Sequence, residues 1–414
     1  MHRGFLLSAA AVSLLGSLAM SHVALAADWP QFKRDAARTG DAADESLKLP
    51  MRRVMALRLP SPIYASPAVV GGMVYVGDAR GNVICAEAAT GRVKWHAKIG
   101  GLKNTSSPAV AGGRVFIGSS AGYLAILDAA DGRLLKKVEA GDAVIASPAA
   151  VGEKIYFSAM NGELFKIDPQ GGVVWKCRPG KARISLVEVA VRGDQILFPA
   201  GTLYHLKDEG KSARQLGVRG FKGRITSGPC FGTAEHFAAQ GFVSEWGHRV
   251  IVNLAGGRGL ATKQMVDSRG VPSFRKDRYF WGGLCYEVPG EKIRGRARPA
   301  WRADSDTLYP GSTHSSPALS SRYMILGSED GRRSRGDRSG ASDLDSLDDC
   351  FLHGEVEPVN DPALVELERH LRRRRQARGP AHRDHVAAWA DVDHVVSAIQ
   401  VGHVPARAAL VGRA

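Results

Sequence analysis

A four-residue segment recurs along this chain, and its spacing constrains the fold more than any other feature. The segment is Ser-Pro-Ala followed by Val, Ala or Leu, and a glycine follows each proline by 14 residues. The four copies begin at Ser66, Ser107, Ser147 and Ser316, and their glycines are Gly81, Gly122, Gly162 and Gly331. Self-similarity at a period of about 41 residues indicates a repeat architecture in which each unit packs on its neighbours.

Three further repeats are degenerate. The interval between the third and fourth copies is close to four periods, and Pro229 and Pro272 fall near two of the three intermediate positions. The remaining position, near Glu188, lacks proline but keeps the surrounding apolar pattern. We therefore expect about seven visible repeats, of which the middle three are degenerate.

Each repeat alternates apolar and polar residues over short segments that glycine-rich turns separate, which is typical of antiparallel strands. In the first repeat the segments are residues 66–70, 73–76, 82–86 and 92–97. Four short strands per repeat predict one blade of an all-β propeller. The repeat glycines are then turn residues, and aromatics such as Tyr75, Phe116 and Tyr156 pack between blades.

Two segments carry a family resemblance. Residues 85–95, which end in Gly91-Arg92-Val93-Lys94-Trp95, and residues 167–175, which end in Trp175, resemble the tryptophan-docking motif of pyrroloquinoline-quinone-like (PQQ-like) propeller repeats. A third copy has Lys136 where tryptophan would stand. The resemblance implies that Trp95 and Trp175 pack between neighbouring blades as structural residues.

The segment Trp29-Pro30-Gln31-Phe32 also resembles the entry segment of such proteins. The family includes quinoprotein dehydrogenases and cofactor-free scaffolds such as BamB, the propeller lipoprotein of the outer-membrane barrel-assembly machinery. The resemblance therefore implies a fold and leaves the function to be argued from the site.

The N-terminus is typical of an export signal. A charged start precedes an apolar run over residues 5–20 and the small-residue pattern Ala24-Leu25-Ala26. We expect residues 1–26 to be a signal peptide, residues 27–331 the propeller and residues 332–414 an atypical tail. The apolar run is shorter than a membrane-spanning helix requires, so we predict a periplasmic or secreted protein with no transmembrane segment.

Charge and cysteine content exclude several classes of function. The net charge is +15, but residues 332–414 carry 13 Arg and 13 acidic residues, so the excess lies diffusely in residues 1–331. Because the chain has no stripe of basic residues interleaved with aromatic residues, we predict that it binds no specific nucleic acid. The five cysteines contain no C-x-x-C pair, which argues against zinc or haem attachment. We expect most of them to be buried strand residues, with one disulfide as an alternative.

A scaffold and an enzyme remain the two function classes. A quinoprotein dehydrogenase needs PQQ, a calcium ion as Lewis acid and a carboxylate base. The family's enzymes typically add adjacent cysteines and cofactor loops, and this chain lacks the vicinal pair. We therefore predict no catalytic residues, no metal site and no cofactor; cofactor-binding residues stay unknown.

The degenerate repeats hold the side chains that such an enzyme could recruit. They are three tryptophans, each with a neighbouring acid: Trp246 with Glu245, Trp281 with Glu287, and Trp301 with Asp304. Packing residues beside solvated charges are the more common explanation of such pairs. We predict a monomeric, non-catalytic scaffold of the cell envelope that binds an unidentified protein or peptide; the alternative is a PQQ-dependent dehydrogenase of alcohols or sugars.

The repeat pattern ends abruptly after Gly331. Where earlier copies begin a strand, the chain has Arg332-Arg333-Ser334-Arg335, and no Lys, Tyr or Met follows. We favour a shift of reading frame over a native extension, with residues from about 335 onward disordered or loosely helical and packing little on the propeller. We further expect residues 53–59 to supply the outer strand of the incomplete last blade, beside residues 324–327.

Overall fold

The protein is described from a computed structural model. The structure describes residues 28–45, 51–182, 185, 187–219, 224–232, 236–243, 246–253, 260–262, 270–281, 284–288, 295–296, 301–302, 316–321, 324–325, 394–401 and 404–411. Their regular elements are all β-strands. In this part of the chain, no helix has the length and apolarity to cross a membrane. The expected signal peptide lies outside the described residues.

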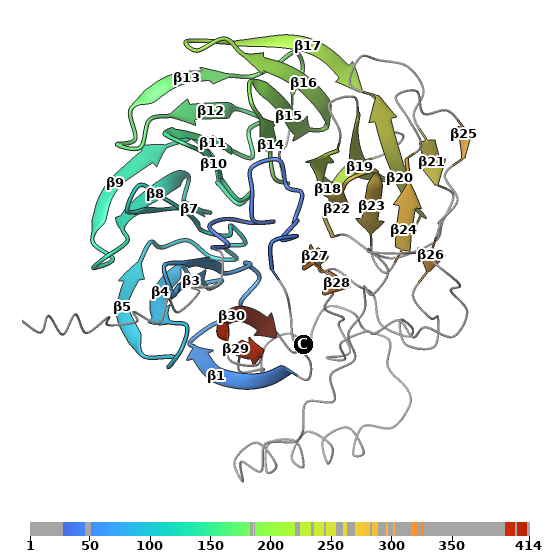
Figure 1. The fold of residues 1–414 in the computed structure, drawn as a ribbon. Coiled ribbons are helices and arrows are strands. Elements are labelled where there is room, and N and C mark those ends of the chain that lie inside the picture. The colour runs from blue at the N-terminus through green and yellow to red at the C-terminus, as the bar shows by residue number, and fades with distance from the viewer. Residues whose placement is uncertain are drawn as a thin grey trace, which may run out of the picture.

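Seven sheets form successive blades around a common centre (Figure 1). Each of the first four has four antiparallel strands in chain order, from the innermost to the outermost. Blade 1 contains β2 (Ala68–Val70), β3 (Met73–Gly77), β4 (Asn82–Glu87) and β5 (Val93–Lys98). Blade 2 contains β6 (Ala109–Ala111), β7 (Arg114–Ser119), β8 (Tyr123–Asp128) and β9 (Leu134–Glu139).

Blades 3 and 4 repeat this order. Blade 3 contains β10 (Ala149–Val151), β11 (Lys154–Ser158), β12 (Leu164–Ile167) and β13 (Val173–Cys177). Blade 4 contains β14 (Ala190–Arg192), β15 (Gln195–Ala200), β16 (Thr202–Asp208) and β17 (Ala213–Arg219). The middle strands are almost wholly buried, because neighbouring blades cover both of their faces.

The degenerate repeats also form blades. Blade 5 contains β18 (Arg224–Phe231), β19 (His236–Val243), β20 (Trp246–Asn253), β21 (Leu260–Thr262) and a short parallel strand, β25 (Gly295–Arg296). Blade 6 contains β22 (Ser273–Arg275), β23 (Arg278–Trp281), β24 (Leu284–Glu287) and β26 (Trp301–Arg302). Blade 7 has two described strands, β27 (Ala318–Leu319) and β28 (Met324–Ile325). The prediction of about seven repeats with an incomplete last blade is confirmed.

The outermost strands of the first four blades share a β-bulge. The register between the third and fourth strands shifts between Cys85 and Ala86, and it shifts at the equivalent point in blades 2, 3 and 4. A bulge twists an edge strand away from regular pairing, so these edges are protected against strand addition by another chain.

The closure model and part of the tail prediction are wrong. The strand β1 (Met51–Leu59) pairs with β29 (His394–Val401), and β29 pairs with β30 (Val404–Val411). Strand β1 does not pair with β28. This sheet lies between blade 1 and blade 7 (Figure 1). The expectation that the tail packs little on the propeller fails for these two strands, because their apolar, β-branched sequences form a hairpin that covers the open edge of β1. The frameshift remains a prediction, and the rest of the tail lies outside the described residues.

The tryptophan-docking prediction is confirmed. Trp95 Nε1 donates to the carbonyl of Ala129 in blade 2 at 2.9 Å, and a Cβ atom at Gly132 would lie 2.5 Å from the Trp95 ring. The stem of Lys136, which replaces tryptophan in blade 2, lies in the same way against Gly171 of blade 3. Only glycine allows so close an approach, and the left-handed φ of Gly132 (74°) favours it as well.

Candidate functional site

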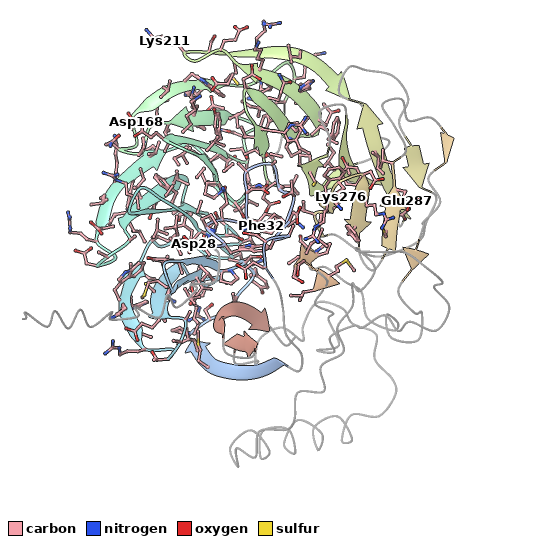
Figure 2. The ribbon with its side chains drawn as sticks, viewed as in Figure 1. Asp28, Phe32, Asp168, Lys211, Lys276 and Glu287 are labelled. Atoms are coloured by element: carbon pink, nitrogen blue, oxygen red, sulfur yellow. The ribbon has the colours of Figure 1, made fainter. Side chains whose placement is uncertain are left out.

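The centre of the propeller is occupied by the chain's own N-terminal segment, residues 28–45, which we call the central segment. It lies inside the ring of innermost strands in Figure 1, and Figure 2 shows Phe32 near the middle while Asp168 and Lys211 lie at the periphery. Buried and less buried residues nearly alternate along residues 31–42. This alternation is typical of a segment that packs between two surfaces, and a free linker would not show it.

The central segment bonds to seven blades in succession. The central or last residue of each innermost strand donates its backbone N–H to an oxygen of the segment, at 2.7–3.0 Å. The donors are Val69, Val110, Ala150, Val191, Phe231, Phe274 and Leu319, and their acceptors belong in the same order to Trp29, Pro30, Gln31, Ala36, Ala37, Thr39 and Gly40. Six acceptors are backbone carbonyls, and the Gln31 side chain supplies the seventh. The inner edges of these strands are therefore satisfied from within the chain.

Arg38 is the most deeply buried charge of the segment. Its side chain is fully buried and donates to four backbone carbonyls, those of Phe32, Ser147, Pro148 and Val189. These carbonyls belong to the segment and to the inner ends of blades 3 and 4. Burial lowers the pKa of Arg38 to about 10, and the Glu188 carboxylate partly offsets this effect. A guanidinium with this many acceptors stays charged and fixes the register of the segment.

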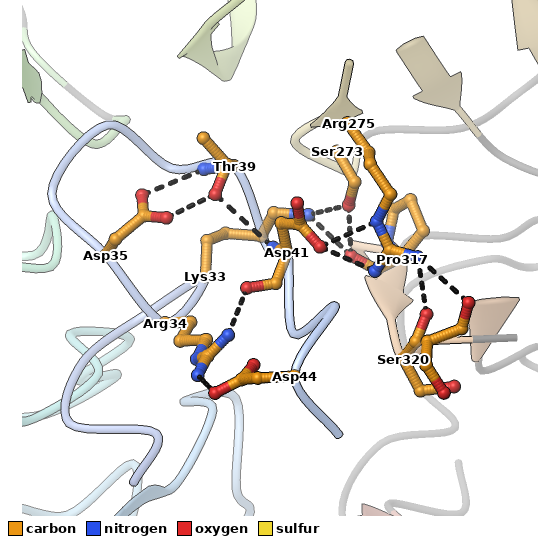
Figure 3. A network of polar contacts seen from close by, with 11 residues as sticks. Lys33, Arg34, Asp35, Thr39, Asp41, Asp44, Ser273, Arg275, Pro317 and Ser320 are labelled. Carbon is orange, nitrogen blue, oxygen red and sulfur yellow. Dashed lines mark hydrogen bonds and ion pairs between the residues drawn. The ribbon is translucent and has the colours of Figure 1, made fainter. Parts of the chain in front are cut away.

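Lys33 anchors the segment on the opposite side of the ring, where Figure 3 shows its contacts. Its amine donates to Ser273 Oγ in β22 and to the Pro317 carbonyl that precedes β27. Burial lowers the pKa of Lys33 to about 7. Among the described residues no carboxylate accepts a hydrogen bond from this amine, so burial outweighs the weaker charge interactions that would raise the pKa.

An ion pair joins the end of the segment to blade 6. Arg275 Nε and Nη2 lie 2.7 Å and 2.5 Å from Asp41 Oδ1, and Arg275 Nη1 donates to the Ser320 carbonyl beside β27 (Figure 3). The backbone carbonyl of Asp41 also accepts a hydrogen bond from Arg34, and Arg34 forms an ion pair with Asp44. The segment is therefore held at both ends and in its middle.

Three residues of the segment adopt strained backbone angles. Lys33, Arg34 and Arg38 have φ of 60°, 69° and 64°, in the left-handed region that side-chain-bearing residues rarely adopt. Such angles cost on the order of 1–3 kcal/mol each, and they persist where the surroundings impose them. The hydrogen bonds of Lys33 and Arg38 are the interactions that impose them here.

The structure describes four of the six aromatic and acidic candidates of the degenerate repeats, and all four lie on strands of blades 5 and 6. Trp281 and Trp301 lie on strands of blade 6, and Trp246 lies on β20 of blade 5. Glu287 is half-exposed and pairs with Arg278 at 2.9 Å, so it is a solvated surface charge. The positions of Glu245 and Asp304 lie outside the described residues. The four described candidates are therefore spread over four strands of two blades.

Sequence reasoning missed the central segment as the main feature of the ring. The sequence did carry one signal, which is the high density of charged residues directly after the Trp29 entry motif. A simple linker does not require so many charged residues, and several of these become buried. Cysteine placement agrees better with expectation. Cys85, Cys230 and Cys285 are buried, Cys177 is partly buried, and all four are free thiols, while Cys350 lies outside the described residues.

The described residues contain no group of three His, Cys, Asp or Glu side chains that could hold a metal ion. The polar groups at the centre of the ring are occupied by contacts within the protein. The backbone donors there already bond to the central segment, and its two buried cations are directed at protein carbonyls and a serine hydroxyl.

Comparison with known proteins agrees with this architecture. Residues 37–206 match the family model described as outer membrane protein assembly factor BamB. The chain is similar to the crystal structure of BamB from Moraxella catarrhalis, with 17% identity and a TM-score of 0.52 over 68% of this chain and 84% of that one. It is also similar to the computationally designed Ika8 protein, with 13% identity and a TM-score of 0.58 over 87% of this chain and 100% of that one.

No curated protein sequence matches the chain. Identities this low show the fold alone. The four-stranded blades and these similarities together show a β-propeller fold, and residues 37–206 carry the match to the BamB family model.

Proposed function

We propose that the chain is an exported, non-catalytic propeller that binds a protein or peptide partner in the cell envelope. The observation that carries this proposal is the central segment. In a propeller the inner strands line the channel in which a small ligand would be held. Here seven of those strands donate to the chain's own segment, which leaves the two faces and the rim for binding.

The family match supports the envelope location and the type of partner. The matched family is described as an outer membrane assembly factor, and the chain begins with a segment typical of an export signal. Assembly factors act by contact with other proteins, so we expect a protein partner rather than a substrate. A PQQ-dependent dehydrogenase is the alternative, and it would require the central segment to leave the channel.

Two measurements test the proposal. The purified mature chain is reconstituted with pyrroloquinoline quinone and calcium, and dye reduction is followed across alcohols and aldoses. We expect no turnover and no quinone absorbance retained after gel filtration. Clear turnover would overturn the scaffold function. In the second measurement, crosslinking in the envelope followed by mass spectrometry should recover a recurrent protein partner.

A further inference from the structure

The loop that joins blade 1 to blade 2 is one residue longer than the next loop on the same face. Ile99 and Ala140 are equivalent, since each donates its backbone N–H to the carbonyl of a repeat glycine, Gly81 or Gly122. The repeat proline follows Ile99 by nine residues, at Pro108, but follows Ala140 by eight. The extra residue lies within residues 100–104, which we call the anchor loop.

The anchor loop presents Leu102, whose side chain is 72% exposed, the largest exposure among the large hydrophobic residues of the described chain. The backbone beneath it is held from both sides. Ser120 Oγ accepts the N–H of Leu102 at 2.8 Å and donates to its carbonyl at 2.7 Å, and Asn104 bonds to both Ser120 and Gly100. A leucine exposed on a rigid loop is pre-organised for binding, because little conformational entropy is lost when it docks.

The surroundings of Leu102 are basic. Arg80, Lys98 and Lys103 are exposed, and the backbone N–H of Asn104 donates to Ala79, which places Lys103 close to the Arg80 loop. The acid of these loops, Asp78, is buried and accepts hydrogen bonds from the backbone of Arg80 and Asn82. The surface is therefore apolar at one point and positive around it.

Two further residues define the extent of this surface. Tyr64 is half-exposed on the loop before β2, and that loop bonds to the Arg80 loop through Ala79 N–H and the Pro62 carbonyl. On the other side, Asp142 is exposed in the loop that follows blade 2 and carries the opposite charge. The basic surface is thus limited to the end of blade 1 and the start of blade 2.

We infer that the anchor loop is the docking point for an acidic protein segment, with Leu102 entering an apolar pocket of the partner and Arg80 and Lys103 meeting carboxylates beside that pocket. This inference rests on the proposed function and specifies the partner's chemistry. An apolar side chain at the centre with charged residues around it matches the apolar core and polar rim of protein–protein interfaces. Binding to a lipid surface would instead require a broad apolar face, and this loop offers a single leucine.

The experiment uses the full mature chain, immobilised and presented to a phage-displayed library of random twelve-residue peptides. Peptides with an apolar or aromatic residue flanked by Asp or Glu should be enriched, and their affinity should fall at least tenfold in Leu102→Asp and decrease as salt is raised. Leu134→Asp is the matched control, because Leu134 is 41% exposed on the outer strand β9 and lies outside the anchor loop. Circular dichroism and the melting temperature should be unchanged in both variants.

Two outcomes would overturn the inference. In the first, no peptides are enriched. In the second, the enriched peptides bind Leu102→Asp and the parent protein with equal affinity. In that second case the scaffold function stands while the docking point lies elsewhere; the scaffold function itself fails only if envelope crosslinking also recovers no recurrent partner. Sedimentation with phosphatidylglycerol vesicles that is lost in Leu102→Asp would assign the loop to a membrane surface instead.

Discussion

Ser147 Oγ donates a hydrogen bond to the Glu188 carboxylate at 3.4 Å, and the two residues occupy equivalent positions in adjacent blades. Each stands two residues before the alanine that begins its innermost strand, Ala149 or Ala190. In earlier blades the same position is serine, and Ser66 N–H and Ser107 N–H donate to the serine of the next blade. Glu188 thus continues a chain of hydrogen bonds between blades and adds a negative charge.

This charge explains why the fourth repeat departs from the pattern. Burial raises the pKa of Glu188, and the Arg38 cation opposes that rise, so each group stabilises the charged form of the other. A buried cation is costly without a counter-charge. The fourth repeat therefore differs in sequence because of the central segment, and the segment and blades 3 and 4 form one electrostatic unit.

Substitution of Arg38 should strongly destabilise the protein. In Arg38→Met four carbonyls lose their donor and Glu188 loses its counter-charge, so we expect the free energy of unfolding to fall by roughly 3–5 kcal/mol. The double variant Arg38→Met with Glu188→Gln should lose less than the sum of the single variants, since the two groups are coupled. Urea unfolding measures all three. Arg133→Met, at a 67% exposed side chain, is the control and should change stability by less than about 0.5 kcal/mol. Additive losses would show that the two groups do not interact.

The stability should also depend on pH through Lys33. Its pKa is about 7 in the folded protein and 10.5 in the unfolded chain, so between these values only the unfolded chain holds the proton. The free energy of unfolding contributed by this group is therefore lowest below pH 7 and rises as the pH increases to 10, by about 1.4 kcal/mol per pH unit at most. Lys33→Met should remove this rise. The two proteins are compared by urea unfolding at pH 7.0, 8.0 and 9.0, and parallel profiles would exclude a lowered pKa for Lys33.

A second buried polar cluster lies between blades 3 and 4. Asp208 accepts hydrogen bonds from Lys166, Tyr156 and Trp175 at 2.7–3.0 Å. Burial would raise the pKa of Asp208, but these hydrogen bonds outweigh burial and lower it. The tryptophan-docking contact of blade 3 thus ends on a carboxylate, whereas that of blade 1 ends on a backbone carbonyl.

Removal of this carboxylate should weaken the blade 3–blade 4 contact. Asp208→Ala leaves the Lys166 amine buried, with the Gly210 carbonyl as its one remaining hydrogen-bond acceptor among the described residues, so we expect a loss of roughly 3–5 kcal/mol in the free energy of unfolding. Asp194→Ala is the matched control, because Asp194 forms an exposed pair with Lys207 and should contribute at most about 1 kcal/mol. Thermal unfolding of both variants is the measurement. Equal effects in the two variants would mean that burial of the Lys166 pair is unimportant.

The repeat motif predicted the blades because strand alternation and turn glycines are local properties. The family resemblance, rather than the repeat itself, implied that Trp95 and Trp175 make contacts between blades. The central segment could not be predicted in this way, because its contacts are distant in the sequence. They join Trp29 and Gly40 to strands 40 and 279 residues away, and no sequence motif in those strands indicates the pairing. The same holds for Leu102, which lies in a loop with one extra residue and becomes distinctive only because Ser120 holds its backbone.

The last prediction concerns β1 and the C-terminal hairpin. Residues 51–59 pair along their length with β29, so truncation of the chain after Asp391 removes the partner of β1 and exposes its edge. We expect the backbone amides of β1 that donate to β29 to exchange with solvent at least tenfold faster, because an unpaired edge strand opens more easily. Hydrogen exchange followed by mass spectrometry measures this, with the amides of β7 and β8 in blade 2 as the internal control. Unchanged exchange in β1 would show that the hairpin does not protect this edge.

Resequencing of the gene adds the decisive comparison. An uninterrupted reading frame together with faster exchange makes the hairpin a native part of the ring. A frame error would mean that β1 pairs in the parent protein with a strand that this sequence no longer encodes.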